Sequence, residues 1–183
     1  GDHTGDCPAV KWTAWDGKTT IVYDDDNTAY VYLSDDVTRT QTISVNSGKT
    51  LYLCLNGHSI TCAADITKAF YATVVISYDA RFVLCDCKGG GTITHTDDTV
   101  GKGVRVGSSS GSPATTSFTM FGGSISGNRV TDTCDEKDGG GVLVQNATFT
   151  MYGGAITDNH LEAATSNYGG GGLCTYNDGE FIM

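Results

Sequence analysis

Short apolar segments recur along the chain at nearly constant intervals, and polar or glycine-rich turns separate them. The clearest copies are residues 118–128 and 149–159, in which a Phe-Thr-Met segment, two glycines and an Ile-centred segment follow one another in the same order. The two copies lie 31 residues apart, and residues 181–183 begin a third. A repeat of this length indicates stacked structural units rather than one mixed core.

Two further columns of residues keep step with this repeat. One consists of isoleucines at spacings of 33, 32 and 31 residues: Ile60, Ile93, Ile125 and Ile156. The other consists of short apolar segments: residues 43–45, 74–76, 104–106, 142–144 and 173–175. The step of 38 residues from position 104 to position 142 marks an insertion.

Each repeat thus contains three short segments of β type, and two of them alternate apolar with polar residues. The inward residues occur in pairs two positions apart: Leu51 and Leu53, Phe82 and Leu84, Phe118 and Met120, Phe149 and Met151. The sequence therefore predicts an all-β parallel β-helix, with coils of about 31 residues and three short strands each. Equivalent residues of neighbouring coils would then stack at about 4.8 Å.

Turn residues separate the predicted strands. The two-glycine step suits a sharp turn, because glycine accepts positive φ. Asn128 and Asn159 occupy a matching place, where we expect the left-handed conformation that asparagine also tolerates. The variable stretches 129–138 and 160–168 are expected to bulge as loops on one side.

The ends of the chain differ from the repeats. Residues 1–28 do not fit the pattern, and their aromatic side chains are expected to fold over the first coil as an N-terminal cap, because the end coil of a solenoid otherwise exposes its interior. Residues 29–183 form the predicted β-helix, which is truncated within a strand at its C-terminal end. We expect the chain to be a piece of a longer protein, and its open C-terminal coil to pair edge to edge with another molecule.

Composition and charge narrow the classes of function. The chain has 11 Lys and Arg against 21 Asp and Glu, a net charge of −10, which argues against nucleic acid as a partner. No apolar run approaches the roughly 18 residues that a membrane span needs, so no membrane insertion is expected. Seven cysteines in 183 residues favour an oxidising compartment, and the odd number leaves either one thiol over or one intermolecular bridge.

Several motifs carry a family likeness. Residues 47–60 read Ser-Gly-Lys-Thr-Leu-Tyr-Leu-Cys-Leu-Asn-Gly-His-Ser-Ile, residues 84–87 read Leu-Cys-Asp-Cys, and residues 12–15 read Trp-Thr-Ala-Trp. Together with the Phe-Thr-Met-x-Gly-Gly repeats, they resemble repeat-bearing surface proteins of gut Firmicutes. The resemblance implies a right-handed parallel β-helix that is secreted or attached to the cell wall, with adhesion to host or microbial surfaces as its expected role.

An enzyme is the obvious alternative, because parallel β-helices also carry polysaccharide lyases and hydrolases. A glycan hydrolase needs two facing carboxylates roughly 5 to 9.5 Å apart, which here means acids at one position of adjacent coils. Asp86 aligns with glycines, and so does Asp158. The acidic runs 24–26, 35–36 and 97–98 fall in turns, where they are expected to be solvated, with a weak calcium site as the alternative. We predict no catalytic residue, no cofactor and no metal.

Four cysteines of the first coils are candidates for a disulfide: Cys54, Cys62, Cys85 and Cys87. Cys54 and Cys85 lie in register, so their Cα atoms would be close enough for a bridge. Two alternatives stay open. A zinc ion could be held if His58 converged with Cys54, Cys85 and Cys87, or the cysteines could be buried free thiols.

Phe121 and Tyr152 are the candidate ligand-binding residues. They share one repeat position, next to the inward Met120 and Met151, so strand alternation predicts two outward rings that stack along the helix axis. Such rings suit a sugar or a protein partner, unless loops of the same coils cover them. The predicted function is non-enzymatic adhesion to a host glycan such as mucin or a host protein such as immunoglobulin. The alternatives are a carbohydrate-active enzyme whose catalytic coils lie outside this chain, and a structural spacer.

Overall fold

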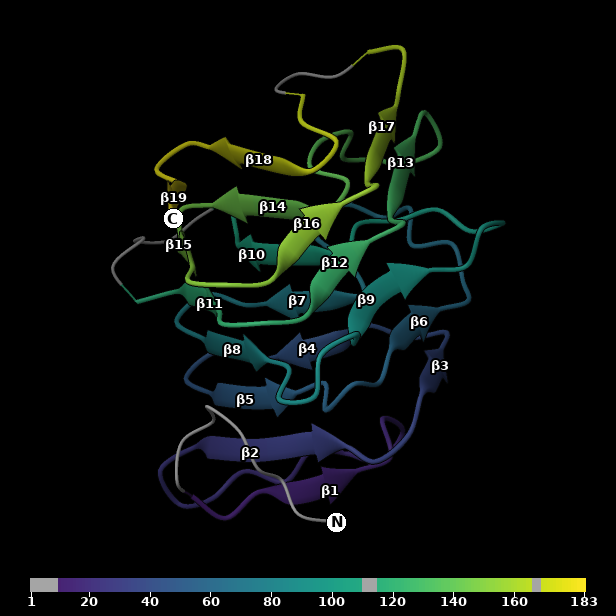
Figure 1. Cartoon of the computed structure of the whole chain (residues 1–183). Coiled ribbons are helices and arrows are strands. Elements are labelled where there is room, and N and C mark those ends of the chain that lie inside the picture. Colours follow the sequence, from purple (N-terminus) through teal and green to yellow (C-terminus); the bar gives the residue numbers. More distant parts are fainter. Residues whose placement is uncertain (1–9, 110–114, 166–168) are drawn as a thin grey trace.

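The chain forms a stack of β-coils that rises from the N-terminal to the C-terminal end (Figure 1). The computed structural model describes residues 10–109, 115–165 and 169–183, and these contain nineteen short strands. They contain no helix, and hence none that could cross a membrane. All the strand pairs of the sheets are parallel, which confirms the predicted parallel β-helix.

The first sheet has seven strands, one from each successive level of the stack. In spatial order they are β1 (Thr13–Trp15), β2 (Thr28–Leu33), β5 (Thr50–Cys54), β8 (Arg81–Cys85), β11 (Ser117–Met120), β15 (Thr148–Met151) and β19 (Glu180–Ile182). The predicted phenylalanine column lies on its inner face, with ring centroids 5.2 Å apart from Phe82 to Phe118 and 4.5 Å apart from Phe118 to Phe149.

The other two large sheets have five strands each. The second contains β4 (Ile43–Val45), β7 (Val74–Ile76), β10 (Val104–Gly107), β14 (Val142–Gln145) and β18 (Leu173–Tyr176). The third contains β3 (Val37–Arg39), β6 (Ile60–Cys62), β9 (Thr92–His95), β12 (Ser124–Ser126) and β16 (Ala155–Thr157). Val104 pairs with Val142 across the insertion, and the isoleucines align from Ile60 onwards, as the repeat predicts.

The stretches predicted as loops are partly strands. β13 (Arg129–Thr131) pairs in parallel with β17 (His160–Glu162), so the expectation of loops over 129–138 and 160–168 is wrong at their first residues. Val130 is wholly buried, and Leu161 packs against the small apolar cluster that contains it. This second apolar cluster explains why the segments pair. Residues 166–168 lie outside the described ranges.

The asparagines at the end of the third sheet do not adopt the expected left-handed conformation. Gly127 (φ 67°) and Asp158 (φ 53°), one position earlier, take it instead. Asn128 and Asn159 bond to one another, because Oδ1 of Asn159 accepts both the backbone N–H and the side-chain Nδ2 of Asn128, at 3.1 and 2.9 Å. Nδ2 of Asn159 donates to the carbonyl of Ile125 at 2.8 Å. The asparagines therefore connect coils rather than relieve turn strain.

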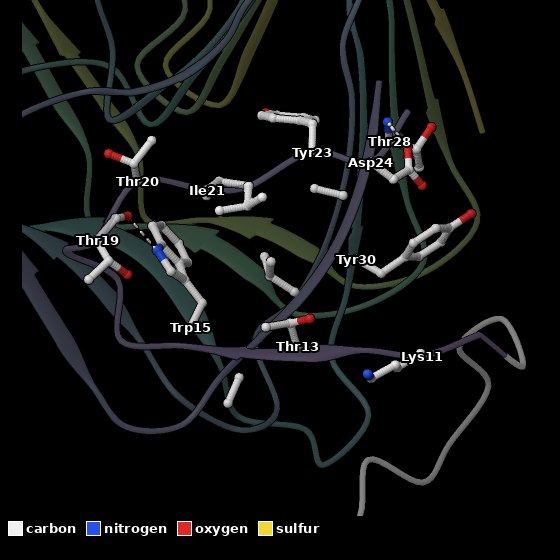
Figure 2. A pocket seen from close by; sticks show the side chains of 14 residues that line it. Lys11, Thr13, Trp15, Thr19, Thr20, Ile21, Tyr23, Asp24, Thr28 and Tyr30 are labelled. Carbon is white, nitrogen blue, oxygen red and sulfur yellow. Dashed lines mark hydrogen bonds between the residues drawn. The ribbon is translucent and has the colours of Figure 1, made fainter. Parts of the chain in front are cut away.

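The N-terminal segment adds one strand to the first sheet, since β1 pairs in parallel with β2. Trp15 is buried, and its Nε1 donates to the carbonyl of Thr19 at 2.8 Å. Ile21 and Tyr23 pack against the core and line, with Trp15, a hollow of about 520 Å³ (Figure 2). The role of residues 1–28 as a cap stays a prediction, and residues 1–9 lie outside the described ranges.

Candidate functional site

Phe121 and Tyr152 form an exposed pair of aromatic rings, here called the aromatic ridge. Each follows directly on a strand of the first sheet, β11 or β15. The sheet pairing continues through their backbone, because the N–H of Phe121 donates to the carbonyl of Leu84 and that of Tyr152 to the carbonyl of Met120, both at 2.8 Å. This fixes the two side chains one above the other.

The geometry of the ridge matches the outward orientation predicted by strand alternation. The ring centroids lie 5.1 Å apart with 12° between the planes. Phe121 is 54% exposed and Tyr152 is 71% exposed, so the loops of their own coils do not cover them. The two rings stack on one another, and both side chains remain largely exposed. The ridge is an apolar surface about two coils long.

A glycine follows each ring of the ridge. A Cβ atom at Gly153 would lie 2.6 Å from the carbonyl oxygen of Phe121, closer than real contacts allow. Glycine is therefore required there for the two coils to approach each other. The two-glycine step predicted as a turn element also leaves the ridge without a flanking side chain on that side.

Cysteines continue the column of the ridge toward the N-terminal end. Tyr32, Cys54 and Cys85 are register partners in β2, β5 and β8, and Phe121 lies next to Cys85 in the same outward column. Ligand atoms of three cysteines gather here: the sulfurs of Cys54, Cys85 and Cys87 all lie within 4.8 Å of one another. We call these three residues the thiol cluster.

The other two candidates from the sequence lie elsewhere. Cys62 contacts the carbonyl of Ala64 through its sulfur at 3.4 Å, and burial raises the pKa of its thiol. The His58 ring lies 3.6 Å from the carboxylate of Asp36. The structure therefore brings together three of the four residues considered for zinc, and Cys62 is not part of the thiol cluster. All four candidate cysteines are in the reduced state in the structure.

A buried group of charged residues was not found from the sequence. Arg105, which is 1% exposed, donates from Nε and Nη2 to the Glu136 carboxylate at 3.1 and 3.3 Å, and from Nη2 to Oε1 of Gln145 at 2.8 Å. Lys102 lies 3.3 Å from the same carboxylate, and the Tyr176 hydroxyl donates to it at 3.1 Å. These five residues are called the ionic cluster below.

Electrostatics in the ionic cluster follow from burial and pairing. Burial lowers the pKa of Lys102, and Glu136 partly offsets this. Burial would raise the pKa of Glu136, but hydrogen bonds and charges from Arg105 and Lys102 outweigh it, so the pKa is lowered. Burial and the neighbouring carboxylate raise the pKa of Tyr176 well above its usual value. The shifts of Glu136 and Tyr176 favour the ordinary charge states of these groups at neutral pH, whereas the shift of Lys102 favours its neutral form.

The ionic cluster fastens loops onto the outer face of the second sheet. Arg105 points outward from β10, where Phe70 covers its guanidinium at 4.8 Å and Glu136 reaches it from the segment between β13 and β14. A hollow of about 390 Å³ lies beside it, lined partly by Glu136 and Tyr176. The sequence marked residues 129–138 only as a variable stretch, which has no periodicity that would place the Glu136 side chain. Because its charges are paired, we assign this cluster a structural role.

Comparison of the chain with family models, with curated proteins and with solved structures gives no match. Of the features above, the aromatic ridge alone combines a rigid scaffold with an exposed apolar surface, which is the combination that a binding site requires.

Proposed function

We propose that the chain is a non-enzymatic adhesion β-helix, secreted or attached to the cell surface, that binds a host glycan such as mucin or a host protein such as immunoglobulin. The observation that carries the proposal is the aromatic ridge, with two stacked rings 54% and 71% exposed. Single exposed apolar side chains are common on protein surfaces and need no explanation. Two stacked rings in one column of a rigid sheet are a defined surface.

Rigidity favours this surface as a binding site. Met120, next to Phe121, lies in the core, Met151, next to Tyr152, packs against it, and backbone hydrogen bonds on the first sheet hold both ring positions. A ligand would therefore order few groups of the protein on binding, which reduces the entropic cost. Aromatic rings also offer apolar contact area together with a quadrupole that attracts C–H groups of a sugar or side chains of a protein.

Charge limits the choice of ligand. With a net charge of −10, the chain repels polyanions over about a Debye length, which is roughly 8 Å at physiological ionic strength. We therefore expect neutral glycans to bind better than sialylated or sulfated ones, and basic protein surfaces better than acidic ones.

The test is an array that carries defined glycans, purified mucin and immunoglobulin. The wild-type chain is compared with the double variant Phe121→Ala/Tyr152→Ala. A matched control is Thr119→Ala/Thr150→Ala, which alters an outward column of the same two strands, two residues away. We expect saturable binding by the wild type and the control, and its loss in the ridge variant.

If the wild type binds to no spot of the array, adhesion to these ligands is overturned. It would leave the structural spacer, or a carbohydrate-active enzyme whose catalytic coils lie outside this chain. Binding that survives in the ridge variant would keep an adhesin but move its site away from Phe121 and Tyr152.

A further inference from the structure

The thiol cluster joins two consecutive coils. Cys54 is the last residue of β5 and Cys85 the last residue of β8, while Cys87 lies in the turn that follows β8. The sulfurs of Cys54 and Cys87 are 3.0 Å apart, and all three sulfurs lie within 4.8 Å. A disulfide needs about 2.05 Å between its sulfurs, so a shift of about 1 Å would bond Cys54 to Cys87.

The geometry distinguishes Cys87 from Cys85 as the partner of Cys54. Cys54 and Cys85 are register partners on parallel strands, so their side chains point the same way and their sulfurs lie side by side. Cys87 instead reaches Cys54 from the turn, and its backbone N–H donates to the Cys54 sulfur at 3.4 Å. The close sulfur contact is thus made between strand and turn.

The carboxylate of Asp86 holds this turn in place. It accepts the backbone N–H of Gly57, from the preceding coil, and that of Gly91, from the end of its own turn, both at 2.7 Å. Since Asp86 lies between Cys85 and Cys87 in the sequence, these two bonds fix the backbone on which Cys87 is carried. The approach of Cys87 to Cys54 is therefore built into the turn and does not depend on a mobile side chain alone.

Burial sets the order in which the thiols meet a reagent. Cys54 has no exposed surface and Cys85 is 9% exposed, whereas Cys87 is partly exposed. A small-molecule disulfide in solution would therefore react first with Cys87. The buried thiol of Cys54 would then react with the mixed disulfide formed at Cys87.

We propose that Cys54 and Cys87 form a disulfide that staples the two coils, with Cys85 kept as a thiol beside it. The oxidant is a low-molecular-weight disulfide such as oxidised glutathione. The thiolate of Cys87 attacks it, forming a mixed disulfide and releasing one glutathione thiolate. The thiolate of Cys54 then attacks the Cys87 sulfur, forming the protein disulfide and releasing the second. The protein loses two electrons and two protons, and the oxidant becomes two thiols.

A metal site fits the same residues less well. Thiolates bound tetrahedrally to zinc at about 2.3 Å lie about 3.8 Å from one another. The sulfurs of Cys54 and Cys87 are 3.0 Å apart, which is closer than two thiolates bound to one zinc ion and nearer to the distance in a disulfide. The cluster of ligand atoms consists of three sulfurs, and the nearby candidate His58 lies against Asp36 instead.

The experiment uses the full chain, purified under reducing conditions and then equilibrated with oxidised and reduced glutathione. Free thiols are alkylated after unfolding, and the chain is digested without reduction and mapped by tandem mass spectrometry. We expect the peptide that carries Cys54 to be linked to the peptide that carries Cys85 and Cys87, two hydrogens lighter than the reduced pair, with Cys85 alkylated. Mapping the wild type needs no variant to fold.

Variants decide between the sulfurs. Cys85→Ser and the control Cys174→Ser should keep the crosslink, whereas Cys87→Ser should lose it, with circular dichroism confirming that each variant is folded. Full alkylation of the oxidised wild type would overturn the proposal, and so would a crosslink that persists in Cys87→Ser through Cys85. Stoichiometric zinc, lost in each cluster variant but retained in Cys174→Ser, would replace the disulfide with a metal site.

Discussion

Buried polar side chains determine how individual positions respond to pH and substitution. His95, at the end of β9, is buried, and its Nε2 lies 3.0 Å from the Thr73 hydroxyl. Burial lowers its pKa to about 4, although the backbone of Lys102 and the charge of Asp65 act in the opposite direction. The folded chain therefore keeps this imidazole neutral under conditions in which an exposed one is charged.

We predict that the stability of the chain decreases between about pH 6.5 and pH 4 through His95. In this window the unfolded chain binds a proton at this position and the folded chain does not, so the free energy of unfolding falls as the pH falls, by about 3 kcal/mol at most. Denaturant unfolding across this range should show a shallower decline for His95→Gln than for the wild type. If the free energy of unfolding falls equally with pH in the two proteins, the pH dependence does not come from His95.

The ionic cluster predicts a large effect of one carboxylate. Glu136→Gln leaves the buried Arg105 and Lys102 without their counter-charge, which should destabilise the chain by about 3 to 5 kcal/mol. The matched control is Glu162→Gln, because Glu162 pairs with Arg129 at 3.5 Å on the exposed surface and should cost at most about 1 kcal/mol. Chemical denaturation measures both, and similar losses would show that the buried pair is not essential.

Strand alternation predicts which way a side chain points but not whether it is buried. Alternation along a strand placed Phe121 and Tyr152 outward, and the structure agrees, because neighbours two residues apart share a face. The same rule places Arg105 outward, yet it is buried. Its burial depends on the loops that carry Phe70 and Glu136, which have no periodicity from which their position could be predicted.

At the scale of elements, each strand is stabilised by the strands above and below it. The three large sheets keep a single register through the stack, so equivalent residues form ladders of rings and branched side chains. The sequence predicted these ladders because the repeats preserve the same residue types at a fixed period. It did not predict β13 and β17, which lie within the variable stretches and pair through Val130 and Leu161.

The phenylalanine ladder predicts a graded response along the stack. Phe118 lies between Phe82 and Phe149 with no exposed surface, so Phe118→Ala should lower the free energy of unfolding by about 4 kcal/mol. Phe181 has one ring neighbour and is partly exposed, so Phe181→Ala should cost clearly less. Denaturant titrations compare the two variants, with Thr119→Ala as an outward control. A larger loss at Phe181 would contradict the ladder.

At the scale of the whole molecule, the described coils form a stack of parallel strands (Figure 1). At the C-terminal end, β16, β18 and β19 each pair with a single neighbouring strand. Unpaired strand edges next to exposed apolar interior are templates for pairing with another molecule. The unpaired strand edges of the last described coil therefore favour association of this chain with a second copy in solution.

We predict that the chain associates with itself through this end as its concentration rises. Thr175 continues the inward column of Val144 but is exposed in the last coil, so Thr175→Lys places a charge at the open edge without removing a core contact. Sedimentation velocity over a concentration series should show association of the wild type and its suppression in the variant. A monomeric wild type at every concentration would refute the prediction.

The proposal that the aromatic ridge binds the ligand is tested most directly by one ratio of affinities. On the array spot that the wild type binds most strongly, the dissociation constant of Phe121→Ala/Tyr152→Ala is divided by that of the wild type. Loss of two exposed rings from the contact should raise the dissociation constant at least about tenfold, which corresponds to about 1.4 kcal/mol. A ratio near one, with Thr119→Ala/Thr150→Ala also unchanged, would show that the ridge does not contact the ligand.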